Sequence, residues 1–198
     1  MKMLLGVMVL AVILSPPAAG AAPGGRVRVG VVDFYAPTPL ATFEGVFPAR
    51  FATDDLSTLL AGAAGDRLVM IPRETVLRSE QTLRWRDADV LHFDRLRALA
   101  DAVGADRLVV GWIPVLSVEG GGGSGPPPPV GDGNGFPAAD ATLVLQVFDA
   151  RQERLVFDAR SSAYEFGGTR AELAKRVVDH ALKPAIPALI DRLTAQTP

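Results

Sequence analysis

The sequence predicts an α/β domain: a single mixed sheet of about five strands, with a parallel centre, an antiparallel meander at one side and helices on its faces. Three patterns predict this class. Strand-like and helix-like apolar spacing alternate in the first half of the chain, two long strand patterns flank a tight turn, and helical spacing follows them. Right-handed crossovers place the second and third strands parallel to the first, one on each side of it.

In the first half, each element follows from the spacing of its apolar residues. Residues 26–34 alternate valine with polar or small residues before Val32 makes the second face apolar, which is typical of a central strand. Two later segments with helical spacing each end at a glycine that suits a helix C-cap. The other elements expected here are helices over 50–64 and 92–103, strands over 68–71 and 107–118, and a helical turn with a loop over 73–90.

A hairpin is expected in the second half. Strand patterns over 141–149 and 154–166 flank a tight turn, and we interpret the string VFDAR, which occurs in both, as a coincidence of the hairpin and not as a repeat architecture. Residues 120–138 consist largely of glycine and proline, which neither pack nor pair, so they predict a flexible loop before this hairpin.

A broken helix should follow the hairpin. Thr169 and Glu172 have the spacing of a capping box that begins a helix. Pro184 and Pro187 should kink or break this helix, because each removes a backbone donor and crowds the preceding turn.

The first 21 residues have the layout of a secretory signal peptide. Lys2 precedes an apolar run of 12 residues, and small residues follow at 19–21. This run is shorter than the roughly 20 residues of a membrane-spanning helix. We therefore expect cleavage after Ala21, a single domain over 22–198 in a bacterial periplasm, and no membrane insertion of the mature chain. The chain has no cysteine, so we expect neither a lipid anchor nor a disulfide.

Composition and motifs narrow the function classes. The formal net charge is −2, so no basic surplus indicates nucleic acid or an anionic membrane as partner. The chain has two histidines, His92 and His180, and no cysteine, so we expect neither a metal nor a cofactor. The sequence contains no serine elbow, HExxH motif or glycine-rich phosphate loop. These observations favour a protein that is not an enzyme.

Four segments together resemble a known periplasmic module. They are RVRVGVVDF, LSTLLAGAAGDRLVMIPRETV, ALADAVGADRLVVGWI and the hairpin VFDARQERLVFDAR. Over about residues 26–194, the chain resembles the module shared by the amino-terminal domain of TolB, the curli-secretion protein CsgG and the penicillin-binding-protein activator LpoB. The lipidated cysteine of CsgG and LpoB is missing, as are segments resembling the TolB propeller and the membrane-inserting hairpins of CsgG. The resemblance implies an envelope interaction domain.

The carboxyl edge of the parallel strands is the expected binding site. Ligands of parallel sheets collect beyond the carboxyl ends of the strands, where the loops 35–48, 72–80 and 119–138 should converge. The side chains expected on this rim are Asp33, Tyr35, Phe43, Glu44, Phe47, Arg73 and Glu74. One interpretation is a rim that binds a peptide or protein. The commoner alternative is that Asp33 accepts hydrogen bonds from its own loop and that both phenylalanines fold back as loop core.

Trp85, between Arg84 and Arg86, is a further candidate for partner binding. Tryptophan and arginine are favoured interface anchors. The alternative, which we favour, is that Trp85 packs against the sheet while both arginines are solvated.

These patterns predict a protein-interaction domain that acts in assembly or maintenance of the bacterial cell envelope, with an envelope protein or peptide as partner. The alternatives are a periplasmic small-ligand sensor and an enzyme with a site at the carboxyl edge of the sheet. An enzyme would show strongly perturbed titratable groups in a pocket there, whereas a binding module would show an apolar patch rimmed by polar groups.

Overall fold

The computed structural model describes residues 26–37, 45–119 and 137–195. They form a five-stranded sheet in the order β2-β1-β3-β4-β5, which confirms the predicted fold class. The strands are β1 (Val27–Val31), β2 (Leu68–Met70), β3 (Arg107–Glu119), β4 (Ala138–Asp149) and β5 (Arg154–Phe166). The predicted signal peptide, Phe43, Glu44 and residues 120–136 of the predicted loop lie outside the described residues.

β1 lies between two parallel neighbours, as the right-handed crossovers predict. It pairs with β2 on one side and with β3 on the other, where Val31 lies beside Val109. β1 ends at Val31 and not at Phe34 as predicted, although the Tyr35 N–H still donates to the Gly111 carbonyl at 3.0 Å. The chain therefore follows β3 beyond the end of the regular strand.

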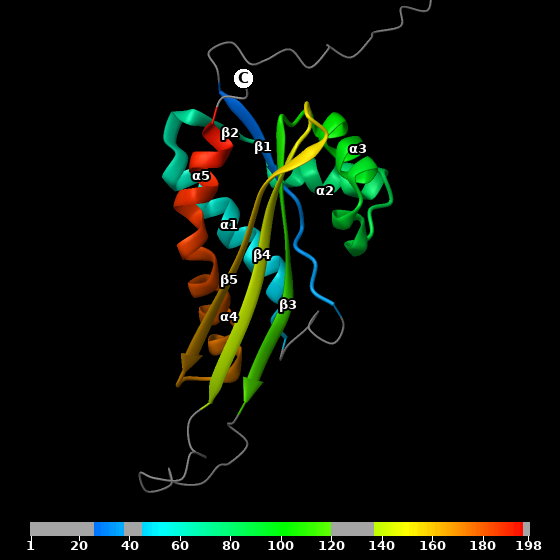
Figure 1. Cartoon of the computed structure of the whole chain (residues 1–198). Helices are drawn as coiled ribbons and strands as arrows, with labels where there is room; N and C mark the ends of the chain where they lie inside the picture. Colours follow the sequence, from blue (N-terminus) through cyan, green and yellow to red (C-terminus); the bar gives the residue numbers. More distant parts are fainter. Residues whose placement is uncertain (1–25, 38–44, 120–136, 196–198) are drawn as a thin grey trace, which may run out of the picture.

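The other three strands form a long antiparallel meander. β3, β4 and β5 are 13, 12 and 13 residues long, whereas β1 and β2 have 5 and 3 residues. The meander therefore extends far beyond the parallel strands (Figure 1). β5 has its predicted bounds, but β4 begins at Ala138, inside the predicted loop, because Glu119 and Phe166 flank Ala138 as ladder partners.

Helices pack on both faces of the sheet. They are α1 (Pro48–Ala64), α2 (Arg73–Thr82), α3 (Phe93–Val103), α4 (Arg170–Leu182) and α5 (Ile186–Thr194). In Figure 1, α1, α4 and α5 lie on one face, and α2 and α3 lie on the other, beside the upper half of the sheet. The first layer encloses the main core around Leu56, Leu143 and Leu189. The second encloses a smaller core around Leu108 and Phe148.

The segment after β2 is more helical than predicted. In place of a helical turn and a loop over 73–90, α2 continues to Thr82 and a short 3-10 helix, η2 (Asp87–Leu91), follows it. No glycine or proline interrupts α2, and Val76 is buried against the smaller core. Burial of the Val76 side chain stabilises this helix, which is hard to predict from a largely polar sequence.

The helix after β5 begins and breaks as predicted. The Thr169 hydroxyl accepts a hydrogen bond from the Glu172 N–H (3.3 Å), and Glu172 Oε2 accepts one from the Thr169 N–H (3.1 Å), which completes the capping box. The 3-10 turn η3 (Lys183–Ala185), which contains Pro184, separates α4 from α5.

A close contact between Phe34 and Gly111 fixes the chain just after β1. The Phe34 ring lies so near Gly111 that a Cβ there would sit 2.5 Å from the ring Cζ. The Phe34 N–H donates to Thr53 Oγ1 of α1 at 2.9 Å. Glycine at 111 therefore lets the aromatic ring enter the main core at the start of the candidate binding edge.

Candidate functional site

The carboxyl ends of β1 and β2 carry an ion-pair network. Arg73, the first residue of α2, places Nη1 2.9 Å from Asp33 Oδ1 and Nε 3.2 Å from Asp54 Oδ1 of α1. Arg50 approaches the other side of Asp54 at 4.0 Å. The Asp33 N–H lies 3.4 Å from Glu80 Oε1 of α2. The structure thus brings Asp33 and Arg73 together, and one arginine joins β1, α1 and α2.

Burial raises the pKa of Asp33, and the neighbouring Arg73 cation opposes this change. Both side chains are engaged within the chain. Asp33 pairs with Arg73 at the start of α2, a partner within the chain that neither interpretation of Asp33 had named. The network is suited to holding two helices at the end of β1.

The two aromatic residues of the predicted rim that the structure describes have different surroundings. Tyr35 is half-buried against the smaller core, and its backbone bridges to Trp112 of β3. Phe47, which immediately precedes α1, is 55% exposed and does not fold back as loop core. Phe47 therefore remains a binding candidate at this edge, whereas Tyr35 contributes to packing.

Trp85 lies in the corner between α2 and η2 and is half-buried against the smaller core. The Arg95 guanidinium lies 5.8 Å from the centre of its ring, within the range of a cation–π contact. Arg95 is itself held by Asp89 Oδ2 and by the Leu83 carbonyl, each at 2.8 Å from Nη2. Trp85 is thus fixed by neighbours on α2, η2 and α3, which is the packed arrangement.

The described ends of the third predicted loop lie far from this edge. β3 pairs with β1 at Val109 and continues to Glu119. At about 3.3 Å per residue, Glu119 lies roughly 30 Å beyond the end of β1. The two ends of the loop 119–138 therefore lie far from the loops 35–48 and 72–80, contrary to the predicted convergence, because β3 continues far past the end of its parallel neighbour.

The lower half of the meander leaves one face of the sheet without a helix among the described residues, and this face was not among the predicted sites (Figure 1). Asp140 of β4 pairs with Ser117 of β3 on one side and with Tyr164 of β5 on the other, so these three side chains share that face. We call this surface the open sheet face; its residues are Val115, Ser117, Asp140, Thr142, Ser162, Tyr164 and Phe166.

Aromatic side chains stand exposed on the open sheet face. Tyr164 is 66% exposed and Phe166 is 72% exposed, and Val115 on β3 is 39% exposed. The alternation of residues along β5 is a sequence signal that could have indicated this surface. Tyr164 and Phe166 alternate with Ala163 and Glu165, so an aromatic occupies each of two successive outward positions of the strand.

Polar residues of the open sheet face bond to one another across the strands. Ser117 Oγ bonds with Asp140 Oδ1, and the hydroxyls of Thr142 and Ser162 lie 2.9 Å apart. The surface therefore combines exposed aromatics with short polar side chains whose positions are fixed by their neighbours.

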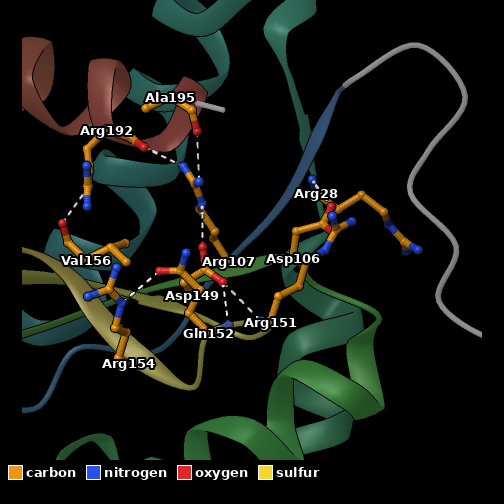
Figure 2. A network of polar contacts seen from close by, with 10 residues as sticks. All are labelled: Arg28, Asp106, Arg107, Asp149, Arg151, Gln152, Arg154, Val156, Arg192 and Ala195. Atoms are coloured by element: carbon orange, nitrogen blue, oxygen red, sulfur yellow. Dashed lines mark hydrogen bonds and ion pairs between the residues drawn. The ribbon is translucent and has the colours of Figure 1, made fainter. Parts of the chain in front are cut away.

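The upper end of the sheet carries a buried arginine that joins β3 to α5 (Figure 2). Arg107 donates through Nη2 to the Ala195 carbonyl at 2.9 Å and through Nη1 to the Arg192 carbonyl. Its Nε lies 3.5 Å from Asp149 Oδ2. Asp149 Oδ1 in turn accepts the N–H groups of Arg151 and Gln152, each at 3.0 Å. Burial lowers the pKa of Arg107, and Asp149 opposes this change.

A second carboxylate extends this network to β1. Asp106 accepts the Arg28 N–H through Oδ2 at 2.9 Å and the Arg151 side chain through Oδ1 at 2.8 Å (Figure 2). The network therefore ties β1, β3, the β4–β5 turn and α5 together. Its geometry is that of a structural clamp.

The part of the chain that the structure describes contains no group of three or more histidine, cysteine, aspartate or glutamate side chains placed to hold a metal. No helix among the described residues is long and apolar enough to span a membrane.

Solved structures share this arrangement of a mixed sheet with helices on both faces. The hypothetical protein CT253 from Chlamydia trachomatis matches with a TM-score of 0.55 and 12% identity, over 86% of this chain and 99% of that one. Lipoprotein GNA1162 from Neisseria meningitidis matches with a TM-score of 0.51 and 12% identity, over 81% and 99%. The LpoB C-terminal domain from Escherichia coli matches with a TM-score of 0.43 and 15% identity, over 75% and 86%. No family model and no curated protein matches the chain.

These likenesses establish a fold. The chain shares that of CT253 and GNA1162, whose TM-scores exceed 0.5. LpoB, named by the sequence resemblance, is among the similar structures, with a TM-score too low to carry a functional argument. The resemblance to TolB and CsgG stays a prediction. GNA1162 is a lipoprotein, whereas this chain contains no cysteine.

Proposed function

We propose that this chain is a non-catalytic protein-interaction domain of the bacterial cell envelope and that the open sheet face binds its partner. The observation that carries the proposal is the exposure of Tyr164 (66%) and Phe166 (72%) at successive outward positions of one strand. Large aromatic side chains are effective interface anchors, because they bury much area while losing few rotatable bonds.

The surroundings of these aromatics favour a protein partner. Ser117, Asp140, Thr142 and Ser162 place hydrogen-bonding groups beside the exposed aromatics, and protein interfaces combine apolar and hydrogen-bonding surface. The carboxyl edge is less suited to this role. There Phe47 is the one described aromatic that is largely exposed, and its charged neighbours Asp33 and Arg73 already form an ion pair with each other.

Export to the periplasm is part of the proposal and rests on the predicted signal peptide. Fractionation of bacteria followed by amino-terminal sequencing should find the protein in the periplasm, beginning at Ala22. Recovery from the cytosol with Met1 intact would contradict export, and it would leave the binding surface to be tested separately.

The binding surface can be tested by photo-crosslinking in intact bacteria. A photoreactive amino acid at position 164 should give a discrete crosslinked partner, and one at position 47 should not. Phe47 is a matched control, because it is also an exposed aromatic but lies at the carboxyl edge. Crosslinking from position 47 alone would move the site to that edge and contradict the proposal.

A substitution measures how much of the affinity the open sheet face provides. Phe166→Ser should weaken partner binding about five- to thirtyfold, as expected for an interface anchor worth about 1–2 kcal/mol. The thermal midpoint should hardly change, because Phe166 is 72% exposed. Hydrolytic activity that is abolished by Asp33→Asn would instead support the enzyme alternative.

A further inference from the structure

The outer edge of β5 is a regular strand without a neighbour among the described strands. β5 is the terminal strand of the sheet and pairs with β4 alone in the described part of the chain. Figure 1 shows it along the near edge of the sheet. Edges of this kind are usually protected by proline, by a bulge or by brevity, because their free N–H and C=O groups can pair with another strand.

The direction of the backbone groups of β5 follows from two hydrogen bonds. The Gly167 N–H donates to the Pro137 carbonyl at 2.8 Å, so odd-numbered residues direct their backbone groups toward β4. The Phe166 carbonyl accepts Arg176 Nη2 at 3.2 Å, so even-numbered residues direct theirs outward. The register is continuous from Phe157 to Phe166. The residues whose N–H and C=O groups face outward are therefore 158, 160, 162 and 164.

Two arginines limit this edge at its ends. Arg192 of α5 donates to the Val156 carbonyl at 2.5 Å, and Arg176 of α4 donates to the Phe166 carbonyl. Val156 is also the extra residue of the bulge between β4 and β5. The regular segment between the two arginine contacts, which we call the free edge, runs from Phe157 to Glu165. It contains neither proline nor glycine, and its midpoint is Ser161.

We propose that two copies of this chain pair through their free edges and so join their sheets. The two strands run antiparallel, with Ser161 of one copy directly opposite Ser161 of the other. In this register Arg160 faces Ser162 of the second copy, and Asp158 faces Tyr164 of the second copy. Every outward backbone group of the free edge then acquires a ladder partner. A two-fold interface of this kind uses the same surface on both subunits and closes after two copies.

Charge argues against two of the neighbouring registers. Pairing about residue 158 or 160 would set two aspartates or two arginines directly opposite each other, which is unfavourable. Pairing about Ser161 avoids both. It also places Arg160 diagonally across from Tyr164 of the second copy, close enough for a cation–π contact. The cation and the acid of each copy therefore meet neutral side chains that can bond to them.

Small residues make close approach of the two strands possible. Ala159 faces Ala163 of the second copy in this register, and Ser161 faces its own counterpart. Pairing about Ala159 would set Asp158 opposite Arg160, but it would require the Val156 carbonyl, which Arg192 already holds, and would run into the bulge. Both open sheet faces would lie on the same side of the joined sheet, although the pairing itself does not depend on what that face binds.

A proline on the free edge tests the pairing. Light scattering of the purified full chain should give twice the monomer mass. Arg160→Pro removes an outward N–H that β4 does not use, so the fold should persist while the dimer dissociation constant rises about tenfold or more. Arg160→Ala is the matched control, because it removes the same side chain and keeps the N–H. Equal dimerisation of the two variants would overturn the proposal, as would a monomeric wild type.

Single cysteines test the register without a disruptive change. The chain has no native cysteine. Directly opposed residues that do not exchange hydrogen bonds have Cα atoms about 4.5 Å apart, which suits a disulfide. Ser161→Cys should therefore form a covalent dimer on mild oxidation. Ala159→Cys alone and Ala163→Cys alone should form no covalent dimer, whereas a mixture of the two should crosslink. Crosslinking of Ala159→Cys by itself would overturn the proposed register.

Discussion

Removal of the Arg107 side chain should destabilise this fold more than loss of any exposed arginine. Arg107 is 5% exposed and Asp149 is 3% exposed, and the guanidinium also binds two carbonyls at the end of α5. Arg107→Ala would leave the Asp149 carboxylate buried without its cation and would free both carbonyls. Breaking a buried ion pair from one side costs about 3–5 kcal/mol, a large part of the roughly 5–15 kcal/mol that stabilises a typical domain.

Urea unfolding followed by tryptophan fluorescence measures this cost, and the chain carries two tryptophans. With a slope near 2 kcal/mol per molar urea, the midpoint should fall by roughly 2 M. Arg97→Ala is the matched control, because Arg97 pairs with Glu153 while about half exposed, and such pairs contribute about 0–1 kcal/mol. Arg107→Lys should restore little, because an ammonium cannot reproduce the fork of donors.

A midpoint shift for Arg107→Ala as small as that for Arg97→Ala would refute the reasoning. It would mean that the apolar contacts of α5 and the bond from Arg192 to the Val156 carbonyl are sufficient to hold this helix, and that the Arg107 contacts in Figure 2 add little to stability. A large shift for Arg107→Ala with none for Asp149→Ala would assign the cost to the α5 carbonyls and not to the ion pair.

Two further predictions concern packing and pH. Gly111→Ala should cost about 1–3 kcal/mol of unfolding free energy, because the new Cβ would lie 2.5 Å from the Phe34 ring. Gly62→Ala is the control and should be neutral or stabilising, because the space around Gly62 is open. Thermal melts measure both changes, and adding Phe34→Leu to Gly111→Ala should recover part of the lost stability. Burial, and secondly repulsion from Asp179, raises the pKa of the Asp55 carboxyl above its ordinary value of 3.8. The folded state therefore binds the carboxyl proton more tightly than the unfolded state does. As a result, the stability of the fold decreases as the pH rises through the raised pKa. Asp55→Asn should therefore be more stable than wild type at pH 7 and should lose this advantage below about pH 4 in urea titrations. An advantage that is the same at both pH values would contradict the linkage.

Much of the fold could be predicted because the apolar spacing of each segment agrees with the general rules for connecting strands in a sheet. The valine alternation of β1 and the right-handed crossovers give the central strand and its two parallel neighbours, and Pro184 marks the break between α4 and α5. α2 was harder to predict as a helix. Its sequence is mostly polar, and its stability depends on the burial of Val76 against a core that forms only in the folded chain.

The candidate site was less predictable, because it depends on strand lengths and not on motifs. Asp33 and Arg73 follow from the strand-end rule, but the ion pair to Asp54 requires the position of α1. The open sheet face follows from the extension of β3 beyond β1, a property of pairing between segments far apart in sequence. Tyr164 and Phe166 could be read as ordinary strand residues until their face was known to lack a helix among the described residues.

The unequal lengths of the strands separate the residues that maintain the fold from those that are free to change. On the lower half of the meander, one face of each strand fills the main core, and the other face contributes little to it. Substitutions on the open sheet face can therefore accumulate without repacking the interior. The same scaffold can acquire new partners by replacing a few outward side chains, so recognition can evolve faster than the architecture that displays it.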